Sequence, residues 1–361
     1  MLEHDDKLDK LQTDFKKFYD KNLIEDYERV ERFRVFYLVL FVILFLSSTG
    51  VLLYILNYLC KNGFSVDDAG LFMRLLGVGI FICFFPAWGF NLISKMNVME
   101  KFVSFFDGMK YGGNSINEED LKKSDLFHSF NECRHKDCFS GCYKGVNINI
   151  SEMKLLVYNM ASRRYNSNYN GVVIKIDLNE NKKGKIVGFI KFDKVLYRDK
   201  ILILSLFMLP ILICALFFRE FIIPSFIPLF LFLVCSLLNL GKESSFGYKN
   251  NKQLIKLEDV VFSKKWNIYA DDQIEARYVL TPALMERLLE IKSLFNSVLL
   301  EFSFCDNQLL ISLPGANMFE TTTLFRSALS YDGIKKVVNE FYCIFSIIDL
   351  LKIKGKENEK N

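Results

Sequence analysis

Five potential metal ligands lie close together in the middle of the chain: His128, Cys133, His135, Cys138 and Cys142. Zinc prefers four nitrogen or sulfur ligands in a tetrahedron, usually with two to four residues inside a ligand pair. The spacing of the three cysteines fits this only loosely, and the chain has no second well-spaced cysteine pair. Two interpretations stay open: a metal-dependent or zinc-stabilised site in the 133–142 loop, or a surface loop with incidental thiols. We assign no metal ligand.

No other group of residues forms a recognisable catalytic pattern. The sequence has no His-Glu-x-x-His, Gly-x-Ser-x-Gly or Walker motif. Four carboxylates in polar segments have no base or nucleophile near them in sequence; they are Glu152, Asp271, Asp272 and Glu275. We therefore assign no catalytic and no cofactor-binding residue, expect no cofactor, and find no small-molecule substrate. Whether the protein is an enzyme stays open, with a non-enzymatic role favoured.

Four hydrophobic segments dominate the rest of the chain. It has 361 residues, 51% of them hydrophobic, with 36 Phe, a composition that excludes a disordered protein. Residues 35–60, 75–94, 201–218 and 221–241 contain no Asp, Glu, Lys, Arg or His. About 20 apolar residues in a helix cross the hydrocarbon core of a bilayer. We predict four transmembrane helices in two hairpins, 35–96 and 201–241, of which the second either spans the bilayer or dips in and returns.

The hydrophobic runs carry no ionisable residue at their centres. Ion-coupled transporters and pumps generally need such groups, so a transporter or channel component is the less favoured interpretation. Gly77, Gly79 and Gly89 are expected to allow close packing of helices.

Basic residues flank the hydrophobic runs on one side. They are Arg29, Arg32, Arg34, Lys95, Lys101, Arg198 and Lys200. The connecting loop 61–70 has a single Lys, so the positive-inside rule places both termini and both soluble segments in the cytoplasm. Nine cysteines, an odd number, in this setting favour free thiols over a disulfide framework.

The soluble residues predict an α+β domain with an antiparallel sheet. Residues 1–34 read as a charged amphipathic helix with a break at Asn22, lying on the membrane or on its own domain, or forming a coiled-coil contact with a partner. Alternating residues at 146–150 predict a strand, and those at 174–178 and 186–192 predict an antiparallel hairpin. The expected domains are residues 1–34, 35–96, 97–200, 201–241 and 242–361, with 97–200 and 242–361 as two parts of one cytoplasmic domain.

The C-terminal segment has clearer local signals. Residues 257–269 look extended, and Thr281 followed by Pro282 predicts a helix start. Residues 298–305 and 308–313 predict a hairpin, and an apolar stripe predicts a last helix over 331–351.

The middle segment, 97–200, is moderately basic. It has 18 Lys and Arg against 13 Asp and Glu, and Arg163, Arg164 and Tyr165 are a weak basic cluster. Solvated surface explains this better than nucleic-acid binding, which we do not expect.

The C-terminal pattern resembles a bacterial integral-membrane family of unknown function, domain of unknown function 3137. The stretches that carry the resemblance are LEDVVF (257–262), NIYADDQ (267–273), EARYVLTP (275–282) and MERL (285–288). The segment 275–288 is the most specific, and residues 145–156, the stretch after Gly171, the N-terminal arm and the first hairpin are also similar. The family's soluble domain is expected to be continuous, whereas 201–241 interrupts it here. The resemblance implies an uncharacterised bacterial inner-membrane protein and no catalytic residues.

The sequence as a whole predicts a membrane-anchored cytoplasmic interaction or scaffold protein. It would be a multi-pass protein of the bacterial inner membrane, in contact with the lipid bilayer, and a protein partner could bind the N-terminal helix or the cytoplasmic domain.

Overall fold

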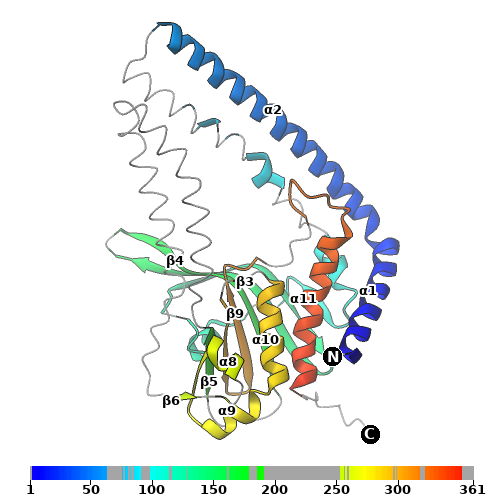
Figure 1. The fold of residues 1–361 in the computed structure, drawn as a ribbon, viewed down its shortest axis with the longest axis vertical. Coiled ribbons are helices and arrows are strands. Elements are labelled where there is room, and N and C mark those ends of the chain that lie inside the picture. Colours follow the sequence, from blue (N-terminus) through cyan, green and yellow to red (C-terminus); the bar gives the residue numbers. More distant parts are fainter. Residues whose placement is uncertain are drawn as a thin grey trace.

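The computed structural model describes an α+β domain and one long helix that projects from it (Figure 1). The residues that the structure describes are 2–62, 75, 78–79, 82, 85–90, 98–113, 116–127, 129–160, 162–178, 185–190, 253–255, 257, 260–295, 297, 299–317 and 322–351. The predicted hairpin 201–241, most of the loop 61–70, Gly77, and His128 lie outside them.

In the described residues, nine strands form a single antiparallel sheet in the order β1-β2-β3-β4-β9-β8-β5-β7-β6. Their bounds are β1 Met109–Tyr111, β2 Glu132–Tyr143, β3 Val146–Asn159, β4 Arg164–Asp177, β5 Ile186–Ile190, β6 Gln253–Ile255, β7 Trp266–Ala270, β8 Glu301–Cys305 and β9 Gln308–Pro314. The sheet therefore combines strands from before and after residues 201–241. Together with the helices, it confirms the mixed α+β class.

Helices cover one face of this sheet, and a long helical arm leaves it (Figure 1). The helices are α1 Leu2–Asn22, α2 Ile24–Asn62, α4 Val98–Val103, α5 Glu118–Lys123, α8 Val260–Lys265, α9 Gln273–Val279, α10 Pro282–Leu294 and α11 Tyr331–Leu350. Helices α10 and α11 lie side by side on the sheet, and α1 lies along α11. Residues 85–90 are also helical.

The main core lies between the sheet and this helical layer. Alternate strand residues point into it, among them Ile150, Ile174, Ile311 and Phe302, which are neighbours across four adjacent strands. Gly188 continues that row on β5, where an added Cβ would lie 2.3 Å from the Phe302 ring. A glycine is needed there because the ring occupies the space of a side chain.

A smaller core lies on the opposite face, under residues 116–130 and helix α5. It includes Leu121, Leu126, Val173 and Leu310, all buried. Lys175, on the same face, pairs with Asp120 of α5 at 2.7 Å, and both side chains are nearly buried (11% and 13% exposed). The pair fixes α5 to the sheet, because each charge would be costly to bury alone.

Helix α1 packs on its own domain. Phe15 is fully buried against Phe102 and Phe105, with ring centroids 5.0 and 4.8 Å away. The Tyr331 hydroxyl of α11 donates to the carbonyl oxygen of Gln12 at 3.1 Å. Of the arrangements considered for residues 1–34, the structure therefore supports contact with the chain's own domain. The predicted break is present one residue after Asn22, at Leu23.

Three local predictions are wrong. The segment 133–142 is part of strand β2, not a loop. The predicted hairpin between 174–178 and 186–192 does not form, because β4 pairs with β3 and β9 while β5 pairs with β7 and β8. Residues 257–269 are not extended throughout, since α8 precedes β7. Local alternation identifies strands but cannot identify their partners, and here the β8–β9 hairpin is inserted between β4 and β5.

The C-terminal signals were more informative. Thr281 caps α10, its hydroxyl accepting a hydrogen bond from the backbone N–H of Leu284 at 3.3 Å, with Pro282 in the first turn. The β8–β9 hairpin turns at Asp306, which has a positive φ of 52°. The predicted last helix is α11. These three predictions are confirmed.

Candidate membrane-interface site

Helix α2 changes its surroundings along its length. Its first turns belong to the α+β domain, where Tyr27 and Val30 are buried. From Val35 onward many large apolar side chains face outward, for example Phe36 at 62% and Leu53 at 66% exposure, although Tyr37 and Phe41 are partly buried. At 39 residues the helix is about 58 Å long. A helix with this much exposed apolar surface normally needs a partner surface or lipid around it.

One segment in the described part of the chain, Ile24–Ile55, is long and apolar enough to cross a membrane. No residue of its most hydrophobic window is fully buried. This is weak evidence for membrane association, because the stretch lies near the N-terminus and length and composition are its only criteria.

A hydrogen-bonded joint holds the base of α2 on the domain. Arg34 donates two hydrogen bonds to the Glu31 carboxylate, at 2.9 and 2.6 Å, and a third to the carbonyl oxygen of Leu324 at 3.0 Å. Glu31 in turn accepts from the backbone N–H of Ala328 at 2.7 Å. The hydrogen bonds from Arg34 are the main reason that the pKa of Glu31 is lowered. The joint therefore ties α2 to the segment that leads into α11.

A second ion pair connects α2 to α4. Lys101 donates to the nearly buried Asp26 at 2.6 Å, and Arg29 lies 3.8 Å from the other oxygen of the same carboxylate. Arg29 itself is 62% exposed. Its charge is therefore only partly satisfied by the protein.

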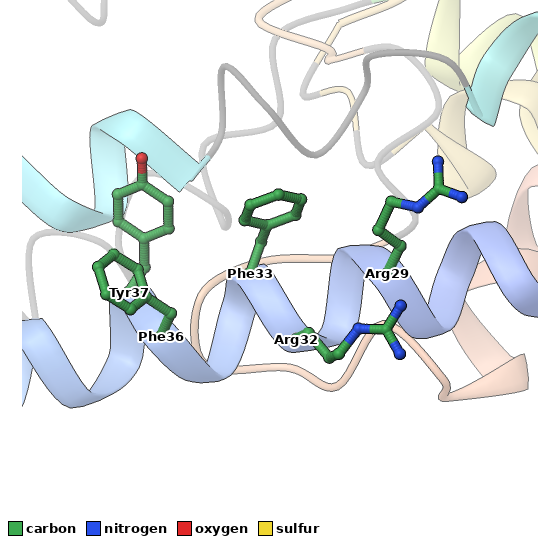
Figure 2. A pocket seen from close by; sticks show the side chains of 5 residues that line it. All are labelled: Arg29, Arg32, Phe33, Phe36 and Tyr37. Atoms are coloured by element: carbon green, nitrogen blue, oxygen red, sulfur yellow. The ribbon is translucent and has the colours of Figure 1, made fainter.

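A hollow of about 470 Å³ lies on α2 between these two joints and the apolar part of the helix. Its lining residues are Arg29, Arg32, Phe33, Phe36 and Tyr37. Figure 2 shows the two guanidinium groups at one end and the three rings following them along the helix. The Tyr37 ring is half-buried and packs near Phe90, with centroids 6.4 Å apart. The site thus combines two cations with an aromatic wall.

Three of the potential metal ligands are brought together on β2. Cys133 Sγ lies 3.4 Å from His135 Nε2, and His135 Nδ1 lies 2.8 Å from Ser151 Oγ of β3. Ser151 Oγ is also 3.3 Å from Cys138 Sγ. A register irregularity between His135 and Asp137 accompanies this grouping. Cys142 is exposed and near the end of the same strand.

The protonation states of this cluster do not suit covalent catalysis. Burial raises the pKa of the Cys133 thiol to about 11 and also raises that of Cys138. Burial lowers the pKa of His135. At neutral pH the thiols are therefore protonated and the imidazole is neutral, whereas a reactive cysteine needs its thiolate. In the described residues no three His, Cys, Asp or Glu side chains are placed as a metal-ligand set.

Several of the other residues singled out in the sequence lie in structural positions. Asp272 caps α9, and Asp271 accepts a hydrogen bond from the backbone N–H of Lys185 at 3.0 Å. Glu152 pairs with Lys136 at 2.6 Å. Arg163 lies in the turn between β3 and β4.

One unusual carboxyl group was missed. Glu301 begins β8 and is buried, and burial raises its pKa to about 8. The sequence does hint at this carboxyl group. Polar Glu301 and Ser303 alternate with Phe302 and Phe304, so they share one face of the strand, opposite the two rings.

The sequence model of one family, described as a protein of unknown function (DUF3137), matches residues 167–353. The chain belongs to the DUF3137 family. The match includes the most specific segment, 275–288, and runs across residues 201–241, so those residues lie within the range that the family model covers. The N-terminal arm, the first hairpin and residues 145–156 lie outside the match.

Comparisons with individual proteins add little to this family assignment. One solved structure, the mycobacterial trehalose monomycolate transport factor A, is 9% identical, with a TM-score of 0.30 over 69% of this chain and 92% of its own. A likeness at that score supports no inference about this DUF3137 chain. No curated protein matches it.

Proposed function

We propose that this DUF3137 chain is a membrane-anchored interaction protein of the bacterial inner membrane, with its α+β domain in the cytoplasm. The observation that carries the proposal is the exposed apolar surface of α2 beyond Val35, on a helix that projects from a domain with a buried core of its own. Lipid is the surrounding that removes this surface from water. The basic residues at the base of α2 favour the cytoplasmic side for the domain.

The proposed topology has four transmembrane helices in two hairpins, 35–96 and 201–241. Two glycine contacts support the first hairpin. A Cβ on Gly79 would lie 2.3 Å from Ser48 Oγ, and one on Gly89 would lie 3.1 Å from the Tyr37 ring. The later glycine, Gly89, thus lies beside the earlier α2 residue, Tyr37, and Gly79 lies beside Ser48. This order is expected of an antiparallel helix pair with small residues at the contact.

The proposed role is to present a surface of the cytoplasmic domain to a protein partner. Helix α1 is a poor candidate, because its apolar residues pack on the domain itself. The β3–β4 hairpin is better suited. Residues 164–169 of β4 pair only with β3 in the described sheet, since the ladder to β9 begins at Gly171 and Gly315 already donates to the carbonyl oxygen of Asn170. Met160, at the hairpin tip, is 85% exposed, and such an edge can accept an added strand.

Membrane extraction tests the anchoring. We expect the chain to stay in the membrane pellet after washing with alkaline carbonate and to dissolve only in detergent. Release into the supernatant with carbonate, or recovery in the soluble fraction after cell lysis, would contradict the proposal.

Purification in a mild detergent tests the interaction role. We expect a stoichiometric protein partner to be recovered with the full chain and lost when residues 158–166 are replaced by a short Gly-Asn turn. Recovery of the chain alone, with no partner at any detergent concentration, counts against this role.

A further inference from the structure

The three arginines before the apolar part of α2 are not equivalent. Arg34 is almost buried, with 12% of its side chain exposed; it pairs with Glu31 of the same helix and donates to the carbonyl oxygen of Leu324, which holds the helix on the domain. Arg32 is exposed and has no ion pair within the described residues. Arg29 is exposed, and among the residues that the structure describes its one ion pair is the 3.8 Å contact with Asp26, a carboxylate already bonded to Lys101. Within the described part of the chain, two guanidinium groups are thus not neutralised by a close ion pair and can face an external anion.

These two arginines and the aromatic side chains form one continuous stripe. Arg29 and Arg32 are three residues apart, and Phe33, Phe36 and Tyr37 follow at helical spacing, so all five line one hollow (Figure 2). Along the helix axis Arg29 and Phe36 are about 10 Å apart. That distance is comparable to the depth of a headgroup layer, roughly 5 to 8 Å on each side of a bilayer.

The chemistry of the stripe changes along this distance. At one end, two guanidinium groups can donate several hydrogen bonds to phosphate oxygens. At the other, the Phe33 and Phe36 rings, 44% and 62% exposed, offer apolar surface. A ligand that fits must have an anionic phosphate and an apolar chain joined within about one headgroup length. A free phosphate would use only the arginines.

We propose that the hollow formed by Arg29, Arg32, Phe33, Phe36 and Tyr37 binds one anionic phospholipid of the cytoplasmic leaflet. Its phosphate contacts the two arginines, and the first part of an acyl chain lies against the rings. This rests on the proposed function, since the helix must be in a bilayer for the lipid to reach it. The proposed function only places the helix in a bilayer. The present proposal adds one defined site that prefers anionic over zwitterionic lipid.

Native mass spectrometry of the full chain in a non-ionic detergent tests the site. The protein is titrated with phosphatidylglycerol or with phosphatidylcholine of the same acyl chains. We expect tighter binding of phosphatidylglycerol, by about tenfold or more. In R29Q/R32Q this preference should disappear, a loss of roughly 10- to 30-fold in affinity from two basic residues. Equal binding of both lipids by the parent, or an unchanged preference in the double variant, overturns the proposal.

A matched control separates the site from net charge. Lys10 and Lys21 on α1 are exposed and have no ion pair within the described residues. The variant K10Q/K21Q removes the same two charges and should keep the preference. If it loses the preference as fully as R29Q/R32Q, the effect is one of total charge and the site is wrong.

Two further arms identify the ligand. F36A should weaken phosphatidylglycerol at least threefold, and unchanged affinity would remove the apolar half of the proposal. Inorganic phosphate at millimolar concentration should not displace the lipid; if it does, the hollow is a soluble-anion site.

Carbonate extraction of the parent separates a failure of the lipid site from a failure of the membrane anchoring. A chain that stays in the membrane but shows no lipid preference refutes the lipid site alone. A chain that is extracted by carbonate refutes the anchoring.

Discussion

Glu301 is a carboxyl group in an environment that disfavours its charge. It is 5% exposed, on a central strand, opposite Ser312 of β9 and Phe189 of β5. Burial raises its pKa from 4.5 to about 8, so at neutral pH the folded chain holds a proton that the unfolded chain has lost. The contribution of Glu301 to stability therefore falls as pH rises between about 4.5 and 8 and is constant outside this window, with a total change on the order of 4 to 5 kcal/mol.

Replacement of Glu301 by Gln should remove this pH dependence. The amide is neutral at every pH, so E301Q should resemble the parent at pH 5 and unfold at a higher temperature than the parent at pH 8.5. Thermal unfolding at both pH values in detergent measures the effect. The exposed Glu286 supplies the control E286Q, which should keep the parent's dependence. The same pH slope in E301Q and the parent would show that Glu301 is not the group responsible.

The cysteines should differ sharply in reactivity. With a pKa near 11, roughly three in ten thousand Cys133 thiols are ionised at pH 7.5. Cys142 is exposed on the same strand. We expect iodoacetamide at pH 7.5 to modify Cys142 at least tenfold faster than Cys133 or Cys138, as followed by peptide mass spectrometry. Faster modification of Cys133 would indicate a thiolate and revive an enzymatic interpretation of the cluster.

Elemental analysis tests the metal alternative for the same cluster. The grouping of Cys133, His135 and Cys138 around Ser151 leads us to expect less than one equivalent of zinc, unchanged in C138S. A full equivalent that is lost in C138S would establish a metal site.

At the scale of elements, the cap of α10 makes a measurable contribution. Thr281 Oγ1 accepts a hydrogen bond from the Leu284 N–H, one of the four N–H groups at a helix start that have no partner within the helix. T281A should lower the free energy of unfolding by about 1 kcal/mol. T281S keeps the hydroxyl and should lose much less. Equal losses in the two variants, measured by denaturant unfolding, would assign the effect to the methyl group.

The elements found from sequence are those with strong local signals. Thr281 with Pro282 marks the start of α10, and Asp306 with Asn307 marks the β8–β9 turn; both depend on neighbouring residues alone. Strand β2 was missed because most of its side chains are only partly buried, so its sequence, ECRHKDCFSGCY, lacks a clear apolar alternation. The β4–β5 pairing was wrong because strand partners are decided by tertiary packing.

The candidate site was only partly predictable for a related reason. The positive-inside rule identifies the basic flank of the first hydrophobic run, which includes Arg29, Arg32 and Arg34. Sequence could not separate Arg34, whose partner Leu324 lies 290 residues away, from the two arginines that face outward. That distinction depends on a long-range contact, and the lipid site follows from it.

At the scale of the whole molecule, the proposed topology places β4 and the segment before α11 on the same side of the membrane. Cysteines replacing the exposed residues Tyr165 and Arg326, in a C142S chain, should both be protected from an impermeant maleimide in intact cells. Both should react in inside-out vesicles. Asp67, in the predicted outer loop, supplies a control: D67C should react in intact cells. Reaction of Tyr165→Cys and Arg326→Cys from opposite sides would refute the topology.

The strand order also determines when the sheet can be completed during synthesis. Strands β1 to β4 pair with sequence neighbours, so they can form a meander as they leave the ribosome. Strand β5 pairs only with β7 and β8 in the described sheet, and both lie beyond residue 265. Every residue of 201–241 must therefore be translated before β5 acquires a neighbour. Until then, the growing chain exposes an incomplete sheet beside its most water-insoluble segment, which makes this interval the stage at which a chaperone or insertase is most needed.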